Sequence, residues 1–269
     1  MEHTFTFGFI GCGNMGGALA EAAAKGNPAM KIAVCDAFTE KAEKLAQKYP
    51  CVTAVKLTNI VLDSQYVFIG VKPQMLEQLF ADIRPLLEQR DDIILVSMAA
   101  GTPIQKLTSL AGKELPVIRI MPNTPVSIGK GMVLYCANLL VKEDELSFFV
   151  NAMSGVGILD EIDENKIDAA SAVSGCGPAF VYIFMEALAD GGVECGLPRD
   201  KAMKYAAATV AGSAEMLLTS GRHPGELKDA VCSPGGTTIA GVHALEKDGF
   251  RAAAMDAVTA AYIKTLGLK

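Results

Sequence analysis

The feature that most constrains this chain is a glycine-rich turn near its N-terminus, Gly11-Cys12-Gly13-Asn14-Met15-Gly16. The turn follows a short apolar run at residues 5–10 that predicts a buried strand, and it opens a segment at residues 14–25 with helical spacing. In this context the first glycine permits a tight turn, the second admits a pyrophosphate, and the third lets the helix pack on the strand. Free N–H groups at the helix start attract phosphate. The turn therefore predicts a dinucleotide-binding site.

Strands and helices continue to alternate beyond this turn. We expect further strands at residues 31–35, 66–71, 93–97 and 117–121, with helical segments between them. This pattern predicts an α/β fold whose N-terminal part is a Rossmann-type, doubly wound parallel sheet.

From residue 164 onward the pattern changes, and no strand is expected. Five segments have helical character: 178–195, 200–220, 225–232, 237–247 and 251–266. We therefore expect a dinucleotide-binding domain at residues 1–162 and an all-helical C-terminal domain at residues 163–269. The segment 205–214 (YAAATVAGSA) has no polar face, which indicates burial on both sides. The helical domain is therefore expected to pair with a second copy of the chain, although burial within one chain is an alternative.

Composition excludes several functions. The net charge is −6 without a basic cluster, which argues against binding to nucleic acid or to a membrane surface. No apolar run is expected to reach transmembrane length, and no secretory signal precedes the first strand. The seven cysteines form no CxxC pair and the three histidines are scattered, so we expect reduced thiols, a cytoplasmic location and no metal.

The choice of cofactor depends on Asp36, which ends the second expected strand. An acidic residue there accepts hydrogen bonds from the ribose hydroxyls and repels a 2′-phosphate. This favours NADH, or use of both NADH and NADPH. Lys41 and Lys44 are close enough in sequence to soften the repulsion, but we interpret them as a solvated helix face.

Three loops follow later strands and are expected to line the nicotinamide side, because ligands of open α/β sheets lie outside the carboxyl ends of the strands. They are Val71-Lys72-Pro73, residues 97–101 and residues 121–125. The expected cofactor-binding residues are Gly11, Cys12, Gly13, Asn14, Met15, Gly16, Asp36, Val71, Lys72, Pro73, Met98, Ala99, Ala100 and Asn123.

A second turn, Ser233-Pro234-Gly235-Gly236, lies in the helical part and opens a helix at Thr237-Thr238. A helix start presents unpaired N–H groups and the positive end of the helix dipole, and the glycines admit a small anion. The turn holds no acidic residue, so it suits a carboxylate. An ordinary helix cap by Ser233 or Thr237 is an equally good interpretation of these residues alone.

Residues 224–246 (PGELKDAVCSPGGTTIAGVHALE) resemble the signature of the pyrroline-5-carboxylate reductases. So do SGCGPAF at 174–180, EALADGGV at 186–193 and GLPR at 196–199, while GFIGCGNMG, VKP, AAG and NTP match in order. The resemblance implies reduction of Δ1-pyrroline-5-carboxylate to L-proline with NADPH or NADH. It also implies a homodimer interlocked through the helical domain, and further assembly such as a pentamer of dimers.

The same resemblance assigns roles to individual residues. Gly235, Gly236 and Thr237 would offer backbone donors to the substrate carboxylate beside Ser233, in an active site completed by the partner subunit. Thr238 would be the catalytic residue, with its hydroxyl near the ring nitrogen. Glu164 would be an acidic residue on the substrate side. NADPH-preferring members have a small hydroxyl or basic residue where this chain has Asp36, which again favours NADH.

Two rival functions are weaker. A β-hydroxyacid dehydrogenase needs a catalytic lysine in the helical domain, but no lysine follows Ser174–Phe180 until Lys201. A dinucleotide sensor without chemistry would be expected to have an eroded substrate turn, whereas residues 233–238 are intact.

Overall fold

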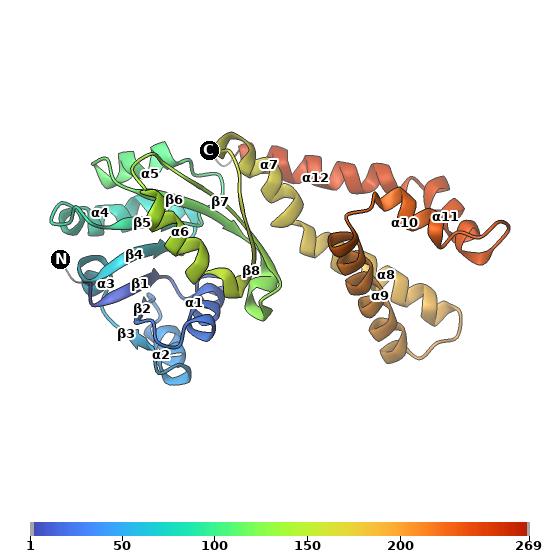
Figure 1. Ribbon diagram of the computed structural model, residues 1–269, viewed down its shortest axis with the longest axis horizontal. Coiled ribbons are helices and arrows are strands. Elements are labelled where there is room, and N and C mark those ends of the chain that lie inside the picture. Colours follow the sequence, from blue (N-terminus) through green and yellow to red (C-terminus); the bar gives the residue numbers. More distant parts are fainter. Residues whose placement is uncertain (1–2, 268–269) are drawn as a thin grey trace. The chain divides into compact units, whose positions relative to one another are not determined.

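The computed structural model describes residues 3–267. Within them one sheet has eight strands in the order β3-β2-β1-β4-β5-β6-β7-β8 (Figure 1). The strands are β1 (Phe5–Ile10), β2 (Ile32–Cys35), β3 (Val52–Ala54), β4 (Ser64–Ile69), β5 (Ile94–Ser97), β6 (Val117–Pro122), β7 (Gly131–Ala137) and β8 (Gly157–Glu161). The first six are parallel and follow the Rossmann order, which confirms the predicted fold class.

The far edge of the sheet differs from the prediction of a purely parallel sheet. β7 runs antiparallel to β6, and β8 pairs parallel with β7. The connection from β6 to β7 contains only the short 3₁₀ helix η2 (Thr124–Ile128). Because a parallel crossover needs a dozen or more residues, so short a connection forces the antiparallel direction.

Helices cover both faces of the sheet. The helices of this part are α1 (Asn14–Gly26), α2 (Thr39–Lys48), α3 (Leu57–Asp63), α4 (Leu76–Leu87), α5 (Ile104–Ala111), α6 (Glu143–Ala152) and α7 (Glu164–Ser174), with the 3₁₀ helices η1 (Pro73–Met75) and η3 (Ser154–Val156). One core contains side chains of α1, α2, α6 and η3, and the other contains side chains of α3, α4, α5 and α7.

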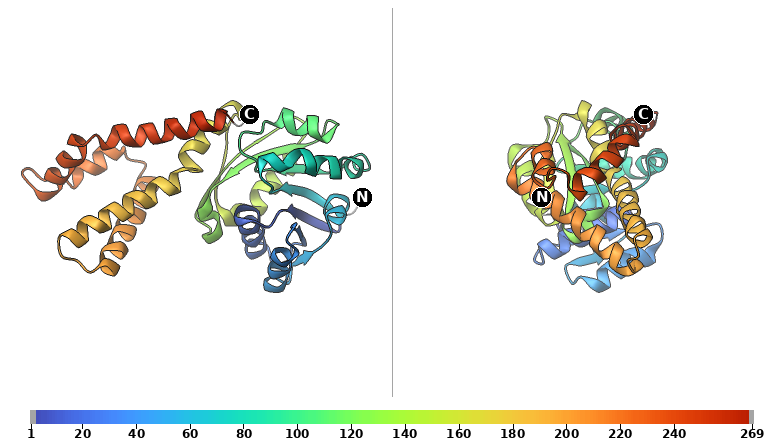
Figure 2. Two further views of the ribbon diagram at one scale, coloured as in Figure 1. Left: turned by 180° about the vertical axis from the view of Figure 1, so that it is seen from behind. Right: turned by 90° about the vertical axis from the view of Figure 1, so that its right-hand side faces the viewer.

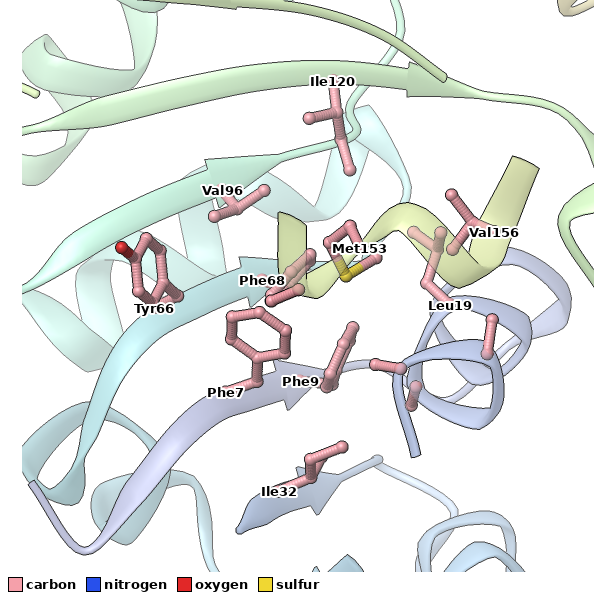
Figure 3. Close-up of a cluster of buried hydrophobic side chains, with 14 of the residues drawn as sticks. Phe7, Phe9, Leu19, Ile32, Tyr66, Phe68, Val96, Ile120, Met153 and Val156 are labelled. Carbon is pink, nitrogen blue, oxygen red and sulfur yellow. The ribbon is translucent and has the colours of Figure 1, made fainter. Parts of the chain in front are cut away.

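The first core is built on aromatic side chains of the two central strands (Figure 3). Phe9 stacks on Phe68 with ring centroids 4.1 Å apart, and Phe7 meets Phe68 edge to face at 5.2 Å. All three rings are fully buried. This apolar layer holds β1 and β4 rigidly side by side, and so fixes the carboxyl ends of the strands at which the glycine-rich turn lies.

Helices α1 and α2 are joined at the surface by Glu21. Its carboxylate accepts hydrogen bonds from Lys48 Nζ at 2.8 Å and from the Tyr49 hydroxyl at 2.6 Å. These two bonds lower the pKa of Glu21 to about 2. The clamp therefore stays ionised down to strongly acidic pH.

The chain divides into two compact units, Met1–Cys176 with Ala261–Lys269, and Gly177–Ala260. The expected boundary after residue 162 coincides with the end of the sheet, whereas the units divide at the end of α7. Helix α7 belongs to the first unit because its residues Ile167 and Ala172 are buried there.

The C-terminal helices agree closely with the expected segments. They are α8 (Gly177–Glu194), α9 (Arg199–Ser220), α10 (Pro224–Ala230), α11 (Thr237–Lys247) and α12 (Phe250–Leu266). α8 and α9 run side by side (Figure 2), around a small core of Ala189, Ala202 and Ala206. Large apolar side chains stay exposed in the single chain, among them Tyr182, Ile183, Tyr205, Met216 and Leu218. A surface of this kind is typical of a subunit interface.

The expectation that no segment reaches transmembrane length is wrong by the simple criteria of length and composition. The helical stretch Glu164–Glu194 is long and apolar enough to cross a membrane. The stretch is interrupted at residues 175–176, directly before Gly177-Pro178, and its first part packs on the sheet.

Candidate active site

The glycine-rich turn lies where β1 ends and α1 begins. Gly11 has a φ of +97°, and a Cβ there would lie 2.6 Å from the Gly70 carbonyl oxygen. A Cβ at Gly16 would lie 2.1 Å from the Gly11 carbonyl oxygen, so the close packing of α1 requires glycine. At Gly13 a Cβ would meet no atom of the described residues within 4 Å. This open backbone, at a helix start without a side-chain cap, fits the approach of a pyrophosphate.

Asp36 follows β2, and its carboxylate is bonded to the glycine-rich turn. Oδ2 accepts a hydrogen bond from the Cys12 N–H at 2.7 Å, and Oδ1 accepts one from the Phe38 N–H at 2.8 Å. The side chain is only 9% exposed, with Lys41 Nζ 4.0 Å from Oδ1. The interpretation of Lys41 as only part of a solvated helix face is therefore wrong, because its ammonium group lies within ion-pair distance of Asp36. Each carboxylate oxygen retains acceptor capacity for a ribose hydroxyl, and the charge opposes a 2′-phosphate.

The buried thiols of the first unit are unsuited to nucleophilic chemistry. Burial raises the pKa of Cys12 to about 12 and that of Cys35 to about 11, and the charge of Asp36 adds to both shifts. Burial also raises the pKa of Cys136 to about 12, with a contribution from Glu164. Because the thiolate is the reactive form, these cysteines act as small packed side chains.

The three expected loops lie together at the end of the sheet where the parallel strands have their carboxyl ends. Val71-Lys72-Pro73, residues 98–101 and residues 123–125 follow the carboxyl ends of β4, β5 and β6, which are neighbours. The second loop is held by a hydrogen bond from the Ala99 N–H to Ser97 Oγ at 3.3 Å, and Gly101 turns it with a φ of +68°. The fold therefore brings the predicted cofactor-side residues to the carboxyl ends of the parallel strands, where the glycine-rich turn also lies.

Asn123, in the third loop, uses both ends of its side chain within the protein. Its Nδ2 donates a hydrogen bond to the Ser174 carbonyl at 2.9 Å, and its Oδ1 accepts one from the Met132 N–H at 2.9 Å. The side chain thus joins the ends of β6 and α7 to the start of β7. A contact with the cofactor would then come mainly from the backbone of this residue.

Glu164 opens α7 and takes part in a charged cluster that includes a residue the sequence analysis missed. Its Oε1 accepts a hydrogen bond from the Ile104 N–H at 2.7 Å and lies 3.5 Å from Arg119 Nη1. Arg119 is almost completely buried in β6 and donates to Asp168 Oδ1 at 2.5 Å. Glu164 therefore anchors the start of α5, directly after the second loop. A lone arginine inside the apolar strand VIRIMP is the signal that would have revealed the cluster.

An open cleft of about 700 Å³ lies against α5, the end of β7 and the start of α7. Its wall contains Glu114, Glu161, Asp163 and Glu164. These four acidic side chains make the cleft unfavourable for an anionic substrate.

In the second unit, the turn before α11 has the form expected of an anion site. Gly235 has a φ of +68°, and Gly236 is the N-cap residue of α11 without a side-chain hydrogen bond to the helix. The ordinary cap by Ser233 or Thr237 is therefore not observed. Instead, the backbone carbonyl of Ser233 closes the turn by accepting a hydrogen bond from the Gly236 N–H at 3.0 Å. The first N–H groups of α11 have no helical carbonyl in front of them and remain available to a ligand.

The fold and the site together define a class: a nicotinamide-dependent oxidoreductase with a Rossmann domain and a helical second domain. Residues 164–268 match the family model described as pyrroline-5-carboxylate reductase dimerisation, and residues 6–101 match that of NADP oxidoreductase, coenzyme F420-dependent. The chain belongs to the pyrroline-5-carboxylate reductase family.

Relatives support this membership over nearly the whole chain. The pyrroline-5-carboxylate reductase of Pisum sativum is 39% identical over 97% of this chain and 95% of its own. That of Escherichia coli K12 is 38% identical over 94% of each chain. The crystal structure of Plasmodium falciparum pyrroline carboxylate reductase with NADP bound has a TM-score of 0.86, 33% identity, and coverage of 100% and 99%.

Proposed function

We infer that this chain reduces Δ1-pyrroline-5-carboxylate to L-proline by hydride transfer from NADH or NADPH, the last step of proline biosynthesis. The reaction is assigned from the membership of the chain in the pyrroline-5-carboxylate reductase family. The structural observation that best supports the substrate is the start of α11, which follows a glycine turn and has no side-chain cap. A carboxylate on the substrate ring matches those donors in charge and in size.

In this proposal the substrate carboxylate binds the backbone N–H groups of Gly235, Gly236 and Thr237, with Ser233 beside them. The Gly236 N–H donates to the Ser233 carbonyl at 3.0 Å, so it would share that bond with the substrate or exchange it for the substrate. The space beside Gly235 is open, because a Cβ placed on this residue would meet no atom of the described residues within 4 Å. Glu164 is the proposed acidic residue on the substrate side, acting through the start of α5 to which it is bonded. The helix dipole of α11 adds a favourable field for the anion.

Thr238 is the proposed catalytic residue. Its hydroxyl would hydrogen-bond to the ring nitrogen and relay the proton that the nitrogen gains. If the imine binds protonated, as an iminium, its carbon is already electrophilic and no strong general acid is required. An active site built from hydroxyl and amide groups is then sufficient. The nicotinamide, when bound, supplies the hydride. The protein's contribution is to hold the imine carbon in place and to exclude water.

For the cofactor, we propose NADH or dual use. The proposed binding residues are the glycine-rich turn of residues 11–16, Asp36, the loop 71–73, residues 98–100 and Asn123, the last through its backbone because both ends of its side chain are bonded within the protein. The carboxylate of Asp36 supports NADH, because it is held against the turn by two backbone N–H groups. The relative with NADP bound shows that the family scaffold accepts the phosphorylated cofactor in that protein, so Asp36 and its neighbour Lys41 would set the balance in this one.

For assembly, the dimerisation family model supports self-association of the chain. We propose that the exposed apolar side chains of α8, α9 and α12 are covered in a homodimer, that the partner subunit completes each active site, and that dimers assemble further, as in a pentamer of dimers. A cytoplasmic location is proposed because all seven cysteines are free thiols.

Two neighbouring threonines test the assignment of the catalytic residue. Thr238→Ala removes the hydroxyl proposed to face the ring nitrogen, so kcat with pyrroline-5-carboxylate should fall by roughly 10²-fold, the lower end of the range of general acid–base contributions. Thr237→Ala keeps the backbone N–H that is proposed to bind the carboxylate, so its loss should be much smaller. Equal kinetics for Thr238→Ala and the unmodified enzyme would remove Thr238 from the mechanism.

A further inference from the structure

The helical stretch from α7 into α8 contains a break that arises because one residue has no backbone N–H. α7 ends at Ser174 and α8 begins at Gly177. In a continuous α-helix the N–H of residue 178 would donate to the carbonyl of residue 174. Residue 178 is a proline and has no N–H. The Ser174 carbonyl therefore lacks its usual helical partner.

The backbone at the break is also wider than a regular helix. The Cys176 N–H donates to the Ser171 carbonyl at 3.2 Å, five residues back, and the Gly175 N–H donates to the same oxygen at 2.8 Å. A Cβ at Gly175 would lie 2.8 Å from that oxygen, so the turn requires glycine. A wide turn of this kind inside a helix is frequent at functional sites.

A side chain from the nucleotide-binding edge supplies the missing donor. Asn123 Nδ2 donates to the Ser174 carbonyl at 2.9 Å, and Asn123 is only 9% exposed. Its Oδ1 is held by the Met132 N–H, so the amide cannot rotate without losing a second bond. One buried side chain thus ties the helix break to the loop that follows β6, beside the expected nicotinamide side.

We propose that Asn123 is a positioning residue for the reduction: its amide replaces the N–H that Pro178 lacks, and so fixes the helix break to the nucleotide-binding edge. The proposal rests on the reductase function inferred above. The chain that leaves the break carries the helical unit, whose substrate turn at residues 233–238 is proposed to complete the active site of the partner subunit. Hydride transfer depends steeply on the placement of the two reacting carbons, so a loosened break should lower turnover.

Asn123→Asp is the sharpest single change. It is nearly isosteric and keeps the acceptor for the Met132 N–H, but it replaces the donor facing the Ser174 carbonyl by an acceptor. Asn138→Asp is a matched control, because Asn138 also donates to a carbonyl, that of Leu115 at 2.9 Å, and accepts from the Val117 N–H at 3.1 Å. Both changes therefore remove one amide-to-carbonyl hydrogen bond from the first unit.

We expect Asn123→Asp to lower kcat by ~10- to 100-fold, since small misplacements of reacting groups cost that much, while the Kd of NADH measured by fluorescence changes less than about 2-fold. Asn138→Asp should lower the Tm to a similar extent but change kcat less than about 2-fold. Equal losses of kcat in the two variants would overturn the proposal, because they would reduce Asn123 to a general structural residue.

A double-mutant cycle of Asn123→Asp and Pro178→Ala, measured by Tm, tests whether the Asn123 amide replaces the missing N–H. It needs no assay of activity. Pro178→Ala restores an N–H at residue 178, so Asn123→Asp should lower the Tm by several degrees in the natural background and by less than half as much in the Pro178→Ala background. All four proteins are compared at one protein concentration, because a dimer's Tm depends on it. Equal Tm losses in both backgrounds overturn the proposal. A protein that shows this coupling but reduces no pyrroline-5-carboxylate would refute the proposed function instead.

Discussion

Replacing Asp36 by asparagine removes one negative charge at the glycine-rich turn while nearly preserving the shape of the side chain. Two unit charges 4 Å apart repel by about 4 kcal/mol at an effective dielectric constant of 20 and by about 1 kcal/mol in water. Lys41 Nζ lies 4.0 Å from Oδ1 and offsets part of that repulsion. We therefore assign a net penalty of about 1.5–3 kcal/mol to a 2′-phosphate. This corresponds to roughly 10- to 150-fold in relative cofactor efficiency, because 1.4 kcal/mol is tenfold.

The assay compares initial rates with pyrroline-5-carboxylate at varied NADH and NADPH. We expect Asp36→Asn to shift the ratio of kcat/KM toward NADPH by that factor. One of the two N–H groups now bonded to the carboxylate would face an amide N–H, so the variant should also lose about 1–2 kcal/mol of stability. Glu40→Gln removes an exposed charge from the first turn of α2 and should leave the ratio unchanged. A ratio that does not move in Asp36→Asn would refute the electrostatic argument.

Three further predictions follow from contacts in the first unit. Gly13→Ala should keep the Tm but raise the KM for either cofactor more than about 10-fold, because the new Cβ enters the space left for the pyrophosphate; Gly16→Ala, whose Cβ would lie 2.1 Å from a carbonyl oxygen, should instead lower the Tm. Arg119→Met should cost about 3–5 kcal/mol in urea unfolding, because it takes the positive charge away from two carboxylates; a loss below 1 kcal/mol would contradict this. The lowered pKa of Glu21 stabilises the fold above pH 4.5, its usual pKa, and this contribution is lost as the pH falls toward about 2. Glu21→Gln should therefore make the Tm less dependent on pH in that window.

Local sequence signals were sufficient for most of the fold. The glycine-rich turn, the apolar runs before it and after it, and the Gly-Pro and Pro-Gly-Gly breaks predicted five of the parallel strands (β1, β2, β4, β5 and β6) and the five C-terminal helices. β3, β7 and β8 were missed: β3 has only three residues, β7 follows β6 through the short connection η2 without a helical crossover, and β8 (GILDE) is short and half polar. The apolar surface of α9 indicated a partner subunit, since its residues remain exposed in the single chain.

The polar network behind the site was harder to predict, because it joins residues far apart in sequence. Arg119 meets Asp168 across 49 residues, and Asn123 meets Ser174 across 51. Sequence placed Asn123 at the correct edge of the sheet, but it did not reveal that its amide is bonded to a helix broken by Pro178. Only the folded chain brings these groups within hydrogen-bond distance.

The central claim is the reduction of pyrroline-5-carboxylate, and one measurement tests it most directly. The purified protein is mixed with pyrroline-5-carboxylate and either NADH or NADPH at equal concentration, and the loss of reduced nicotinamide is followed together with the formation of L-proline. The account predicts oxidation of the cofactor matched mole for mole by proline, with NADH used at least as well as NADPH. No proline with either cofactor, from a folded protein that binds NADH, would contradict it.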